Sequence, residues 1–564
     1  MLASLLFTLL GQLGIADELQ PSFPDRAFAK ATATAEHSIR VKTTETAIGM
    51  MSSIHVFVQA EDNCGVGISV SRVNYIGNPH KTLAGLALGR LHAVPVEENT
   101  GLGGRTEQFE GKQNPHVIRR APFLVFDPIE PLPLVEKTGE VKGSALAKNG
   151  GVAFRLSFTP KQPGEFQFSV NIKAPNNNRE TFRWNVNVYD FTLPPRSEVG
   201  FAYTNWFSPN EIADRHNLER WSPEFWNMLA IYANLMSHGG QDTFWLRWQD
   251  FFHDLGVVGW RLDAERLERY IRIFLDAGFQ WIEGAPIARR PNNDWSKTWL
   301  ELRFGKVPAT SEGGEVIIRK LAEQVNALFV DKGWDEQWIQ HLADEPTDVN
   351  AEDYRKLSSI LRKYVPGIRI VEATMTRQLA GAVDIWCPQV HKYQQNRKFF
   401  IERQAAGDQV WTYTCLVPGG PWLNRLLDQE RLRQVYLGWA GAHYNTQGFL
   451  HWGLNQYKAD PFTQSVVDHP AQPNTTNKLP AGDTHIIYPG PDQPWSSTRF
   501  EAHRIGLEDL AMLRTVQKNN PSAAAEIIKQ VFRNYDDWES SVDVYRRARG
   551  KLLKAAAEKV ITPR

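Results

Sequence analysis

The sequence predicts an α/β protein in which a (β/α)8 barrel follows an antiparallel β-sandwich and precedes a helical C-terminal segment. Its 564 residues exceed what a single hydrophobic core supports, so we expect more than one domain. Residues from about 25 to 195 alternate apolar and polar side chains with period two, which is typical of antiparallel sheets. After this region, strand-like and helix-like segments alternate over about 250 residues, which is typical of a (β/α)8 barrel.

The first 16 residues are uncharged and mostly apolar, and residues 1–16 are interpreted as a possible signal peptide. They are too short to span a bilayer, and Gly14-Ile15-Ala16 places small residues around a cleavage site. The alternative is a first buried strand or helix, because no Lys or Arg precedes the apolar run. Cleavage predicts a secreted or periplasmic protein, and an uncleaved segment predicts a cytoplasmic one.

Residues 17–195 are expected to form the β-sandwich domain. Residues 152–158, for example, alternate apolar with other side chains, and turn-rich segments follow such runs at short, regular spacing. Pro194-Pro195 is the expected linker, because neither proline can continue a strand ladder or a helix.

Residues 196–498 are expected to form the barrel. Apolar residues at helical spacing in 317–328 and 431–443 predict helices between its strands. A doubly wound sheet is the alternative, but no glycine-rich phosphate loop follows any strand. Residues 499–564 are expected to be helical and to pack on the barrel. The eight expected strands are residues 200–206, 242–248, 280–287, 337–344, 368–373, 383–390, 410–416 and 448–454.

The composition argues against several classes of partner. Lys plus Arg and Asp plus Glu both number 63, so the formal net charge is zero. Nucleic acids and anionic membrane surfaces require basic patches, so we expect neither, and no later segment is long and apolar enough to span a membrane. Three cysteines and 15 histidines show no ligand spacing, so no metal and no cofactor is expected. The sequence does not indicate an oligomeric state.

Asp344-Glu345-Pro346 ends the expected fourth strand of the barrel. Adjacent carboxylates repel each other, which separates their pKa values and leaves one acid protonated near neutral pH. Active sites of barrels lie at the C-terminal ends of the strands. Asp344 and Glu345 are therefore the candidate catalytic pair, although an isolated Asp-Glu-Pro is more often a solvated turn.

Aromatic, amide and basic side chains gather at the other expected strand ends. Aromatic faces stack on the apolar faces of sugar rings, and polar groups bind sugar hydroxyls. Each residue alone has an ordinary explanation in packing or solvation, but their clustering favours a carbohydrate site. The candidate substrate-binding residues are Asn205, Trp206, Arg247, His391, Tyr393, Tyr413, Trp452 and Asn455.

The seventh expected strand carries no carboxylate that could be the nucleophile of a double-displacement glycosidase. An adjacent Asp-Glu pair suits substrate assistance, in which the sugar's 2-acetamido oxygen attacks the anomeric carbon. One carboxylate then holds the acetamide N–H and the other protonates the leaving oxygen. Consecutive strand residues point to opposite faces, so the strand must bend at Asp344.

Two alternatives stay open at this point. The first is an inverting glycosidase in which Glu345 is the acid and a carboxylate such as Glu372 or Asp384 is the base, with room for a water between them. The second is a non-catalytic carbohydrate-binding protein that has kept the barrel.

Several short motifs together carry a resemblance to a known family. They are Ala343-Asp344-Glu345-Pro346, Gly448-Phe449-Leu450-His451-Trp452, Tyr488-Pro489-Gly490, Ser497-Thr498-Arg499 and Arg504-Ile505-Gly506-Leu507-Glu508-Asp509. With them the chain resembles glycoside hydrolase family 123 over roughly residues 150–515, and the N-terminal third is compatible with that family. The resemblance implies an exo-acting, retaining, substrate-assisted β-N-acetylgalactosaminidase that acts on a glycolipid or glycoprotein oligosaccharide. It maps Asp344 to the residue that orients and polarises the acetamide and Glu345 to the general acid/base.

Overall fold

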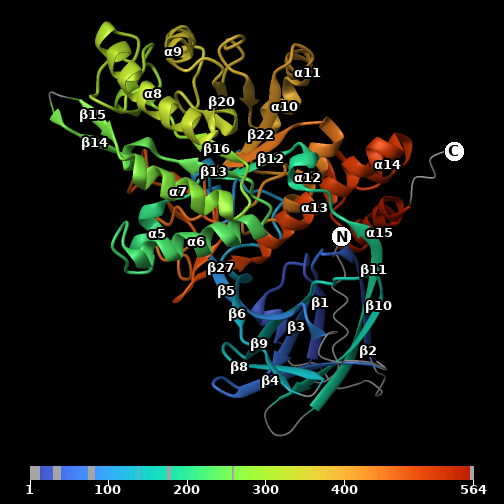
Figure 1. Cartoon of the computed structure of the whole chain (residues 1–564). Helices are drawn as coiled ribbons and strands as arrows, with labels where there is room; N and C mark the ends of the chain where they lie inside the picture. The colour runs from blue at the N-terminus through green and yellow to red at the C-terminus, as the bar shows by residue number, and fades with distance from the viewer. Residues whose placement is uncertain are drawn as a thin grey trace.

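The computed structural model describes residues 13–28, 40–73, 83–137, 139–174, 179–256 and 259–558. A β-rich N-terminal region lies below a barrel that is surrounded by helices, and the last helices lie beside both regions (Figure 1).

The N-terminal region is a sandwich of two sheets, as the sequence predicts. Phe154, Phe168 and Trp184 are fully buried between the sheets. Neighbouring strands are antiparallel, except that β2 and β11 pair in parallel. One sheet has the order β1 (Leu13–Asp17), β3 (Ser52–Gln59), β9 (Gly151–Phe158), β5 (Leu86–Val96), β6 (Phe123–Leu132), β27 (Pro494–Ser497), β26 (Tyr488–Pro489). The other has the order β2 (Arg40–Ile48), β11 (Arg179–Thr192), β10 (Gly164–Lys173), β4 (Gly65–Arg72), β8 (Glu140–Leu146), β7 (Val135–Lys137).

Strand β1 includes the end of the expected signal segment. Residues 13–16 lie in this strand, which pairs antiparallel with β3, and residues 1–12 lie outside the described residues. Asp17 at the end of β1 accepts two hydrogen bonds from the Arg546 guanidinium, at 3.0 and 2.8 Å. The strand is thereby tied to the C-terminal helix as well as to the sheet.

The barrel is closed and consists of eight parallel strands, which confirms the predicted fold class. Each observed strand falls within or near its expected range. The fourth strand is much shorter than residues 337–344, because the chain leaves the sheet before it reaches Asp344. The strands are β12 (Ala202–Asn205), β13 (Thr243–Leu246), β16 (Trp281–Gly284), β19 (Trp338–Gln340), β20 (Arg369–Ala373), β21 (Ile385–Cys387), β22 (Gln409–Thr414) and β23 (Gly448–His451).

Helices connect most of these strands, and side-chain caps define where several begin. The hydroxyls of Ser222 and Ser311 accept hydrogen bonds from the N–H groups of Phe225 and Gly314, each three residues further on. The helices are α5 (Pro209–Arg215), α6 (Pro223–His238), α7 (Ala264–Asp276), α8 (Glu312–Lys332), α9 (Ala351–Tyr364), α10 (Val390–Gln395), α11 (Arg397–Ala405) and α12 (Leu432–Tyr444). Short hairpins extend the loops: β14 (Phe252–Asp254) with β15 (Trp260–Leu262), β17 (Ala288–Arg289) with β18 (Glu301–Leu302), β24 (Val467–Asp468) with β25 (Lys478–Leu479), and β28 (Phe532–Asn534) with β29 (Asp537–Trp538).

Three helices follow the barrel: α13 (Thr498–Asn519), α14 (Pro521–Lys529) and α15 (Val542–Ala557). Helix α13 packs closely on α12 at two glycines. A Cβ on Gly438 would lie 2.0 Å from the carbonyl oxygen of Gly506, so only glycine allows this approach.

A buried polar cluster joins the sandwich to the barrel and to α13. Asp127, on β6, accepts hydrogen bonds from the Arg499 Nε at 2.9 Å, the Tyr488 hydroxyl at 2.8 Å and the Thr498 hydroxyl at 2.8 Å. Burial raises the pKa of Asp127, but the Arg499 and Arg431 charges outweigh it and lower the pKa below its ordinary value. Strands β26 and β27 add to the sandwich sheet beside β6. Residues 488–497, which we expected to belong to the barrel domain, therefore complete a sheet of the sandwich.

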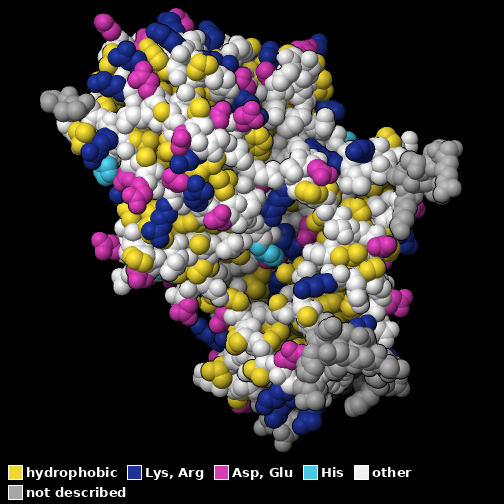
Figure 2. All heavy atoms as spheres, viewed as in Figure 1, with side chains coloured by type: hydrophobic (Ala, Val, Ile, Leu, Met, Phe, Trp, Pro, Cys, Tyr) yellow, Lys and Arg dark blue, Asp and Glu magenta, His cyan; other side chains and the backbone are white. Residues whose placement is uncertain are grey.

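Charged side chains of both signs are interspersed over the face shown in Figure 2. This pattern agrees with the formal net charge of zero. In the described part of the chain, no helix combines the length and the hydropathy needed to cross a membrane.

Asp127→Ala is expected to destabilise the whole chain. The substitution leaves the buried Arg499 guanidinium without its carboxylate, and breaking a buried pair in this way typically costs about 3–5 kcal/mol. Thermal unfolding followed by circular dichroism measures the loss. Glu352→Ala, which breaks the exposed Glu352–Lys356 pair on α9, should leave Tm unchanged. Similar Tm values for wild type and both variants would contradict the role of Asp127.

Candidate active site

Asp344 and Glu345 lie where the chain leaves the barrel after β19. β19 ends at Gln340, and Ala343 forms one parallel bridge with Ala288 before the chain turns. Glu345 has a φ of 50°, in the left-handed region that side chains other than glycine rarely adopt. Both carboxyl side chains are half-buried. This turn replaces the continued strand that would have sent the two side chains to opposite faces.

Arg290 holds the backbone of this turn. Its guanidinium donates hydrogen bonds to the carbonyl oxygens of Asp344 at 3.0 Å and Glu345 at 2.8 Å. The same guanidinium lies 3.6 Å from the centre of the Trp295 ring, and Trp295 is 49% exposed. A left-handed residue with a side chain costs about 1–3 kcal/mol unless its surroundings hold it. Arg290 supplies that restraint.

Tyr413, on β22, holds the Glu345 carboxylate. Its hydroxyl donates a hydrogen bond to Glu345 Oε1 at 2.5 Å. Burial raises the pKa of Tyr413 well above its ordinary value, and the Glu345 charge adds to this effect. The hydroxyl therefore stays protonated near neutral pH and continues to donate, which fixes the position of the Glu345 carboxylate.

His341 lies between two fully buried carboxylates beneath the pair. Its Nε2 is 2.8 Å from Glu283 Oε1, and its Nδ1 is 3.0 Å from Glu372 Oε1. Burial alone would lower the pKa of His341, but the two carboxylates raise it from 6.5 to about 10. The ring is thus an imidazolium at neutral pH. Its contribution to stability is complete below about pH 6.5 and is lost only as the pH rises through about 10.

Glu372 anchors the chain just before Asp344. Its Oε2 accepts hydrogen bonds from the N–H groups of Leu342 and Ala343, both at 3.0 Å, and from the Tyr354 hydroxyl at 2.8 Å. With His341 on the other oxygen, both oxygens are occupied and buried. Glu372 is therefore poorly placed to activate a water, as an inverting base would have to do.

Asp384 is no better placed as a base. It accepts hydrogen bonds from the Arg362 guanidinium at 2.8 Å and the Ile370 N–H at 2.7 Å. It directly precedes β21, at the end of the barrel opposite the one that carries Asp344.

The Asp344 carboxyl group accepts no hydrogen bond from any side chain or N–H group in the described ranges. Burial raises its pKa from 3.8 to about 7. The negative charges of Glu345 and Glu372 add to this rise, and the positive charges of His341 and Arg290 oppose it. Near neutral pH the Asp344–Glu345 pair therefore still binds a proton. One carboxylate and one acid side by side are the two groups that glycosidic bond cleavage needs.

Two tryptophans at the strand ends are oriented by buried carboxylates. Trp206 donates from Nε1 to Glu283 Oε1 at 2.8 Å and stacks on Trp245 with 4.1 Å between ring centres. Trp452 donates from Nε1 to Asp483 Oδ1 at 3.3 Å. Both predicted tryptophans are half-buried and pack against the interior cluster that contains Tyr413. They can present an apolar ring face to a sugar beside the pair.

Three predicted substrate-binding residues are fully buried inside the protein, so the structure does not bring them to the site. Asn205 accepts from Arg425 and donates to Gln241 at 3.0 Å. Asn455 bonds the backbone of Ser208 at 2.8 and 3.2 Å. Tyr393 stacks on Phe400 in the core. Their positions near strand ends led to the prediction that they bind substrate, but their side chains face the layer that surrounds the barrel strands.

Arg247 and His391 lie at the ends of their strands, as expected, and both are half-buried. Arg247 follows β13. His391 is on α10, and its ring centre is 5.9 Å from that of Trp422. Burial and the nearby Lys392 lower the pKa of His391 to about 4, so its imidazole is neutral near pH 7. Their contact with substrate stays a prediction.

The sequence analysis did not predict Arg290, Trp295 or His341. His341 stands three residues before Asp344 in a largely apolar run, where it and Gln340 are the polar residues, and this was a visible signal. Arg290 and Trp295 reach the pair only through the folded loop after β16, and no spacing in the sequence shows that contact.

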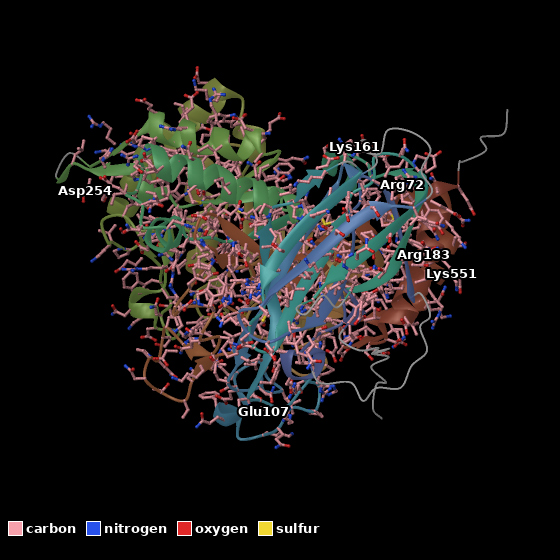
Figure 3. All side chains as sticks on the ribbon, turned by 90° about the horizontal axis from the view of Figure 1, so that it is seen from below. Arg72, Glu107, Lys161, Arg183, Asp254 and Lys551 are labelled. Atoms are coloured by element: carbon pink, nitrogen blue, oxygen red, sulfur yellow. The ribbon has the colours of Figure 1, made fainter. Side chains whose placement is uncertain are left out.

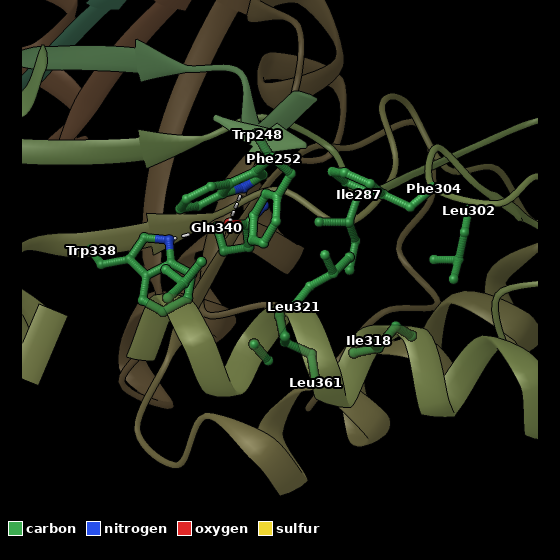
Figure 4. A pocket seen from close by; sticks show the side chains of 12 residues that line it. Trp248, Phe252, Ile287, Leu302, Phe304, Ile318, Leu321, Trp338, Gln340 and Leu361 are labelled. Atoms are coloured by element: carbon green, nitrogen blue, oxygen red, sulfur yellow. Dashed lines mark hydrogen bonds between the residues drawn. The ribbon is translucent and has the colours of Figure 1, made fainter. Parts of the chain in front are cut away.

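An apolar cavity lies between the strand ends of β13 and β19 and helix α8 (Figure 4). Gln340 within it accepts hydrogen bonds from the indoles of Trp248 at 2.9 Å and Trp338 at 3.2 Å. Its lining contains no carboxylate, so it is not the place for the chemistry. Among the described residues, no group of three or more His, Cys, Asp or Glu side chains could hold a metal ion.

Residues 206–516 match the family model described as glycoside hydrolase 123, catalytic domain. The chain belongs to glycoside hydrolase family 123. The match contains Asp344, Glu345, Tyr413 and Trp452, so the geometry above is that of a glycoside hydrolase, and its substrate is a glycan.

A solved structure agrees with this family at the level of the fold. A family 123 glycoside hydrolase from Clostridium perfringens, described for glycolipid glycan hydrolysis, aligns with a TM-score of 0.68 and 14% identity over 96% of this chain and 97% of that chain. A family 39 glycoside hydrolase from Bacteroides cellulosilyticus WH2 aligns with a TM-score of 0.37 and 11% identity over 83% and 81% of the two chains. A search of curated proteins returned no match.

The pH dependence of this family 123 chain is expected to follow the proton on the Asp344–Glu345 pair. As the pH rises through about 7, the pair loses that proton, and kcat/KM, which reports on the free enzyme, should fall up to tenfold per pH unit. In Asp344→Asn the neighbouring charge is gone, so the fall in residual kcat/KM should begin at a lower pH. A constant kcat/KM of the wild type between pH 6 and 9 would contradict a shared proton.

Proposed function

We propose that this protein releases terminal β-linked N-acetylgalactosamine from glycolipid or glycoprotein oligosaccharides by a retaining, substrate-assisted mechanism. In the first step the 2-acetamido oxygen forms a bond to the anomeric carbon while the glycosidic C–O bond breaks. The Glu345 proton moves to the leaving oxygen, and an oxazolinium-like intermediate results. Water then adds to the anomeric carbon and gives its proton to Glu345 while the bond between that carbon and the acetamide oxygen breaks, so the sugar leaves with its original configuration.

One observation carries this proposal: the half-buried Asp344 carboxyl group, directly beside Glu345, has no hydrogen-bond partner in the described ranges. Glu283 and Glu372 are saturated by His341, Trp206 and backbone N–H groups. Neither of these two carboxylates is therefore free to be a nucleophile, which favours a nucleophile supplied by the substrate itself. Asp344 is free to accept the acetamide N–H.

The raised pKa of Asp344 fits the same division of roles. The acetamide gains positive charge on nitrogen as its oxygen attacks, and this charge favours the ionised form of Asp344. The proton of the pair then resides on Glu345, where the leaving oxygen needs it. Substrate binding thus converts a pair that shares a proton into one carboxylate and one acid.

Trp206 and Trp452 support recognition of a sugar ring. Each indole N–H is fixed by a buried carboxylate, so the rings are held before the substrate arrives and lose little freedom on binding. The likeness to the Clostridium perfringens enzyme, which is described for glycolipid glycan hydrolysis, supports a glycolipid glycan as the substrate.

Glu345→Gln is expected to fold normally and to lose about 10²–10⁴-fold in turnover of an N-acetylgalactosaminide with a poor, alkyl leaving group. An activated nitrophenyl leaving group needs less protonation, so its cleavage should lose less. Steady-state kinetics on both substrates measure the difference, and Glu352→Gln on α9 is the matched control. Equal losses on both substrates, with cleavage rate-limiting in each, would remove Glu345 as the acid.

Asp344→Ala tests the orientation of the acetamide. A thiazoline analogue of N-acetylgalactosamine resembles the cyclic intermediate and should bind wild type at least about 10²-fold more tightly than the free sugar. Asp344→Ala should weaken thiazoline binding far more than binding of the sugar, as measured by calorimetry. A trifluoroacetyl substrate, whose amide oxygen is less nucleophilic, should be cleaved much more slowly by wild type.

The outcome that contradicts substrate assistance is equally definite. Trifluoroacetyl and acetyl substrates would be cleaved at the same rate, and the thiazoline would bind no better than the sugar. Proton NMR of the first product would then show inversion at the anomeric carbon, and the inverting alternative would replace this proposal.

A further inference from the structure

A loop of the sandwich, residues 97–122 between β5 and β6, reaches the rim of the barrel. The buried Asp428 carboxylate accepts hydrogen bonds from the Thr100 N–H at 2.7 Å and its hydroxyl at 2.8 Å. Glu97 accepts from the Ser465 N–H at 2.9 Å and its hydroxyl at 2.7 Å. The loop is therefore attached at two places to segments that follow β22 and β23.

The backbone of this loop touches the segment that follows Tyr413. Gly104 has a φ of 108°, and a Cβ there would lie 2.2 Å from the Leu416 carbonyl oxygen. A Cβ on Gly419 would lie 2.1 Å from the Gly101 carbonyl oxygen. Both glycines are required by direct contact between the two chain segments. The residue after Gly104 is consequently placed at the C-terminal end of β22.

That residue is Arg105, and its backbone is fixed. Its N–H and that of Gly103 donate to Glu110 at 3.0 Å, at the end of the short helix α3 (Glu107–Glu110); Figure 3 labels Glu107 of this helix. The Arg105 side chain is half-buried. Within the described ranges, its guanidinium has no hydrogen bond or ion pair.

The contact of Gly104 with Leu416 places Arg105 near the end of β22, the strand whose Tyr413 binds Glu345. The positive charge of Arg105 acts on Cys415, two residues after Tyr413, and on the fully buried Asp483. Asp483 Oδ1 accepts a hydrogen bond from the Trp452 indole at 3.3 Å, and its Oδ2 has no hydrogen-bond partner among the described residues. Arg105 therefore lies on the rim near the ends of β22 and β23.

The proposed substrate selects the kind of acceptor. The terminal sugar of an N-acetylgalactosaminide carries hydroxyl groups and no anionic group, so hydroxyl oxygens are the acceptors that it offers to Arg105. A guanidinium has only donors, and hydroxyl oxygens accept from them. We propose that Arg105 is a substrate-binding residue supplied by the sandwich, and that it donates hydrogen bonds to a hydroxyl oxygen of the terminal sugar that lies against Trp452. This inference rests on the proposed hydrolysis of N-acetylgalactosaminides.

The test combines Arg105→Ala with substrates that lack one hydroxyl. Nitrophenyl N-acetyl-β-galactosaminide and its 4-deoxy and 6-deoxy analogues are compared in wild type and variant, in a cycle that isolates one contact. Loss of a hydrogen bond from a charged donor should raise KM about tenfold or more with the full substrate. With the analogue that lacks the bonded hydroxyl, wild type and variant should agree within about twofold.

Two controls keep the result specific. Arg119→Ala removes another arginine of the same loop, whose guanidinium bonds Asp25 at 2.7 Å, and should leave KM unchanged. Arg105→Lys should recover part of the affinity. Calorimetry with free N-acetylgalactosamine should show the same weakening for Arg105→Ala as KM does, while Tm stays at the wild-type value.

Three outcomes overturn the inference. A KM for Arg105→Ala equal to that of wild type would show that Arg105 does not contact the substrate. An equal loss with all three substrates assigns Arg105 to another part of the glycan. A wild type that neither binds nor cleaves any N-acetylgalactosaminide defeats the proposed function itself, and the inference with it.

Discussion

The imidazolium of His341, held between Glu283 and Glu372, is the interaction on which the rest of the site depends. Glu283 lies on β16, Glu372 lies on β20, and His341 directly follows β19, so the three groups join neighbouring strands of the barrel. Each carboxylate then performs a second task. Glu283 fixes the indole of Trp206, and Glu372 fixes the backbone N–H groups of Leu342 and Ala343 just before Asp344. Removal of His341 would leave two buried carboxylates without their counter-charge, at a typical cost of about 3–5 kcal/mol.

The same arrangement controls the proton chemistry above it. Two carboxylates and one imidazolium leave a net negative charge beneath Asp344 and Glu345. That charge, with burial, opposes ionisation of Asp344 and keeps a proton on the pair near neutral pH. Arg290 could neutralise the pair, but it donates to the two carbonyl oxygens rather than to the carboxylates. The fold therefore restrains the backbone of the pair and leaves its side chains available for substrate.

The sequence predicted the barrel well because its strands are short apolar runs between helices with one apolar face. It predicted the end of β19 less well, because the positive φ of Glu345 and the donors from Arg290 depend on long-range contacts. The structure places Trp206, Tyr413 and Trp452 in or against the interior cluster at the strand ends, and it places Asn205, Tyr393 and Asn455 in the surrounding layer. A residue near a strand end can point inward or outward, and a one-residue shift of the strand reverses the two. Arg290 comes from a loop 54 residues before Asp344, so no local pattern could identify it.

The sandwich and the barrel are joined by a shared sheet and a buried ion pair as well as by the linker. Strand β27 pairs with β6 of the sandwich and leads directly into α13, whose Arg499 is paired with Asp127 of β6. The sandwich cannot rotate on the barrel without breaking a sheet and a buried ion pair. Loop 97–122 is thereby held in one position against the barrel. Its contacts with Asp428 and Leu416 define that position. The rim near the ends of β22 and β23 is consequently built by both regions.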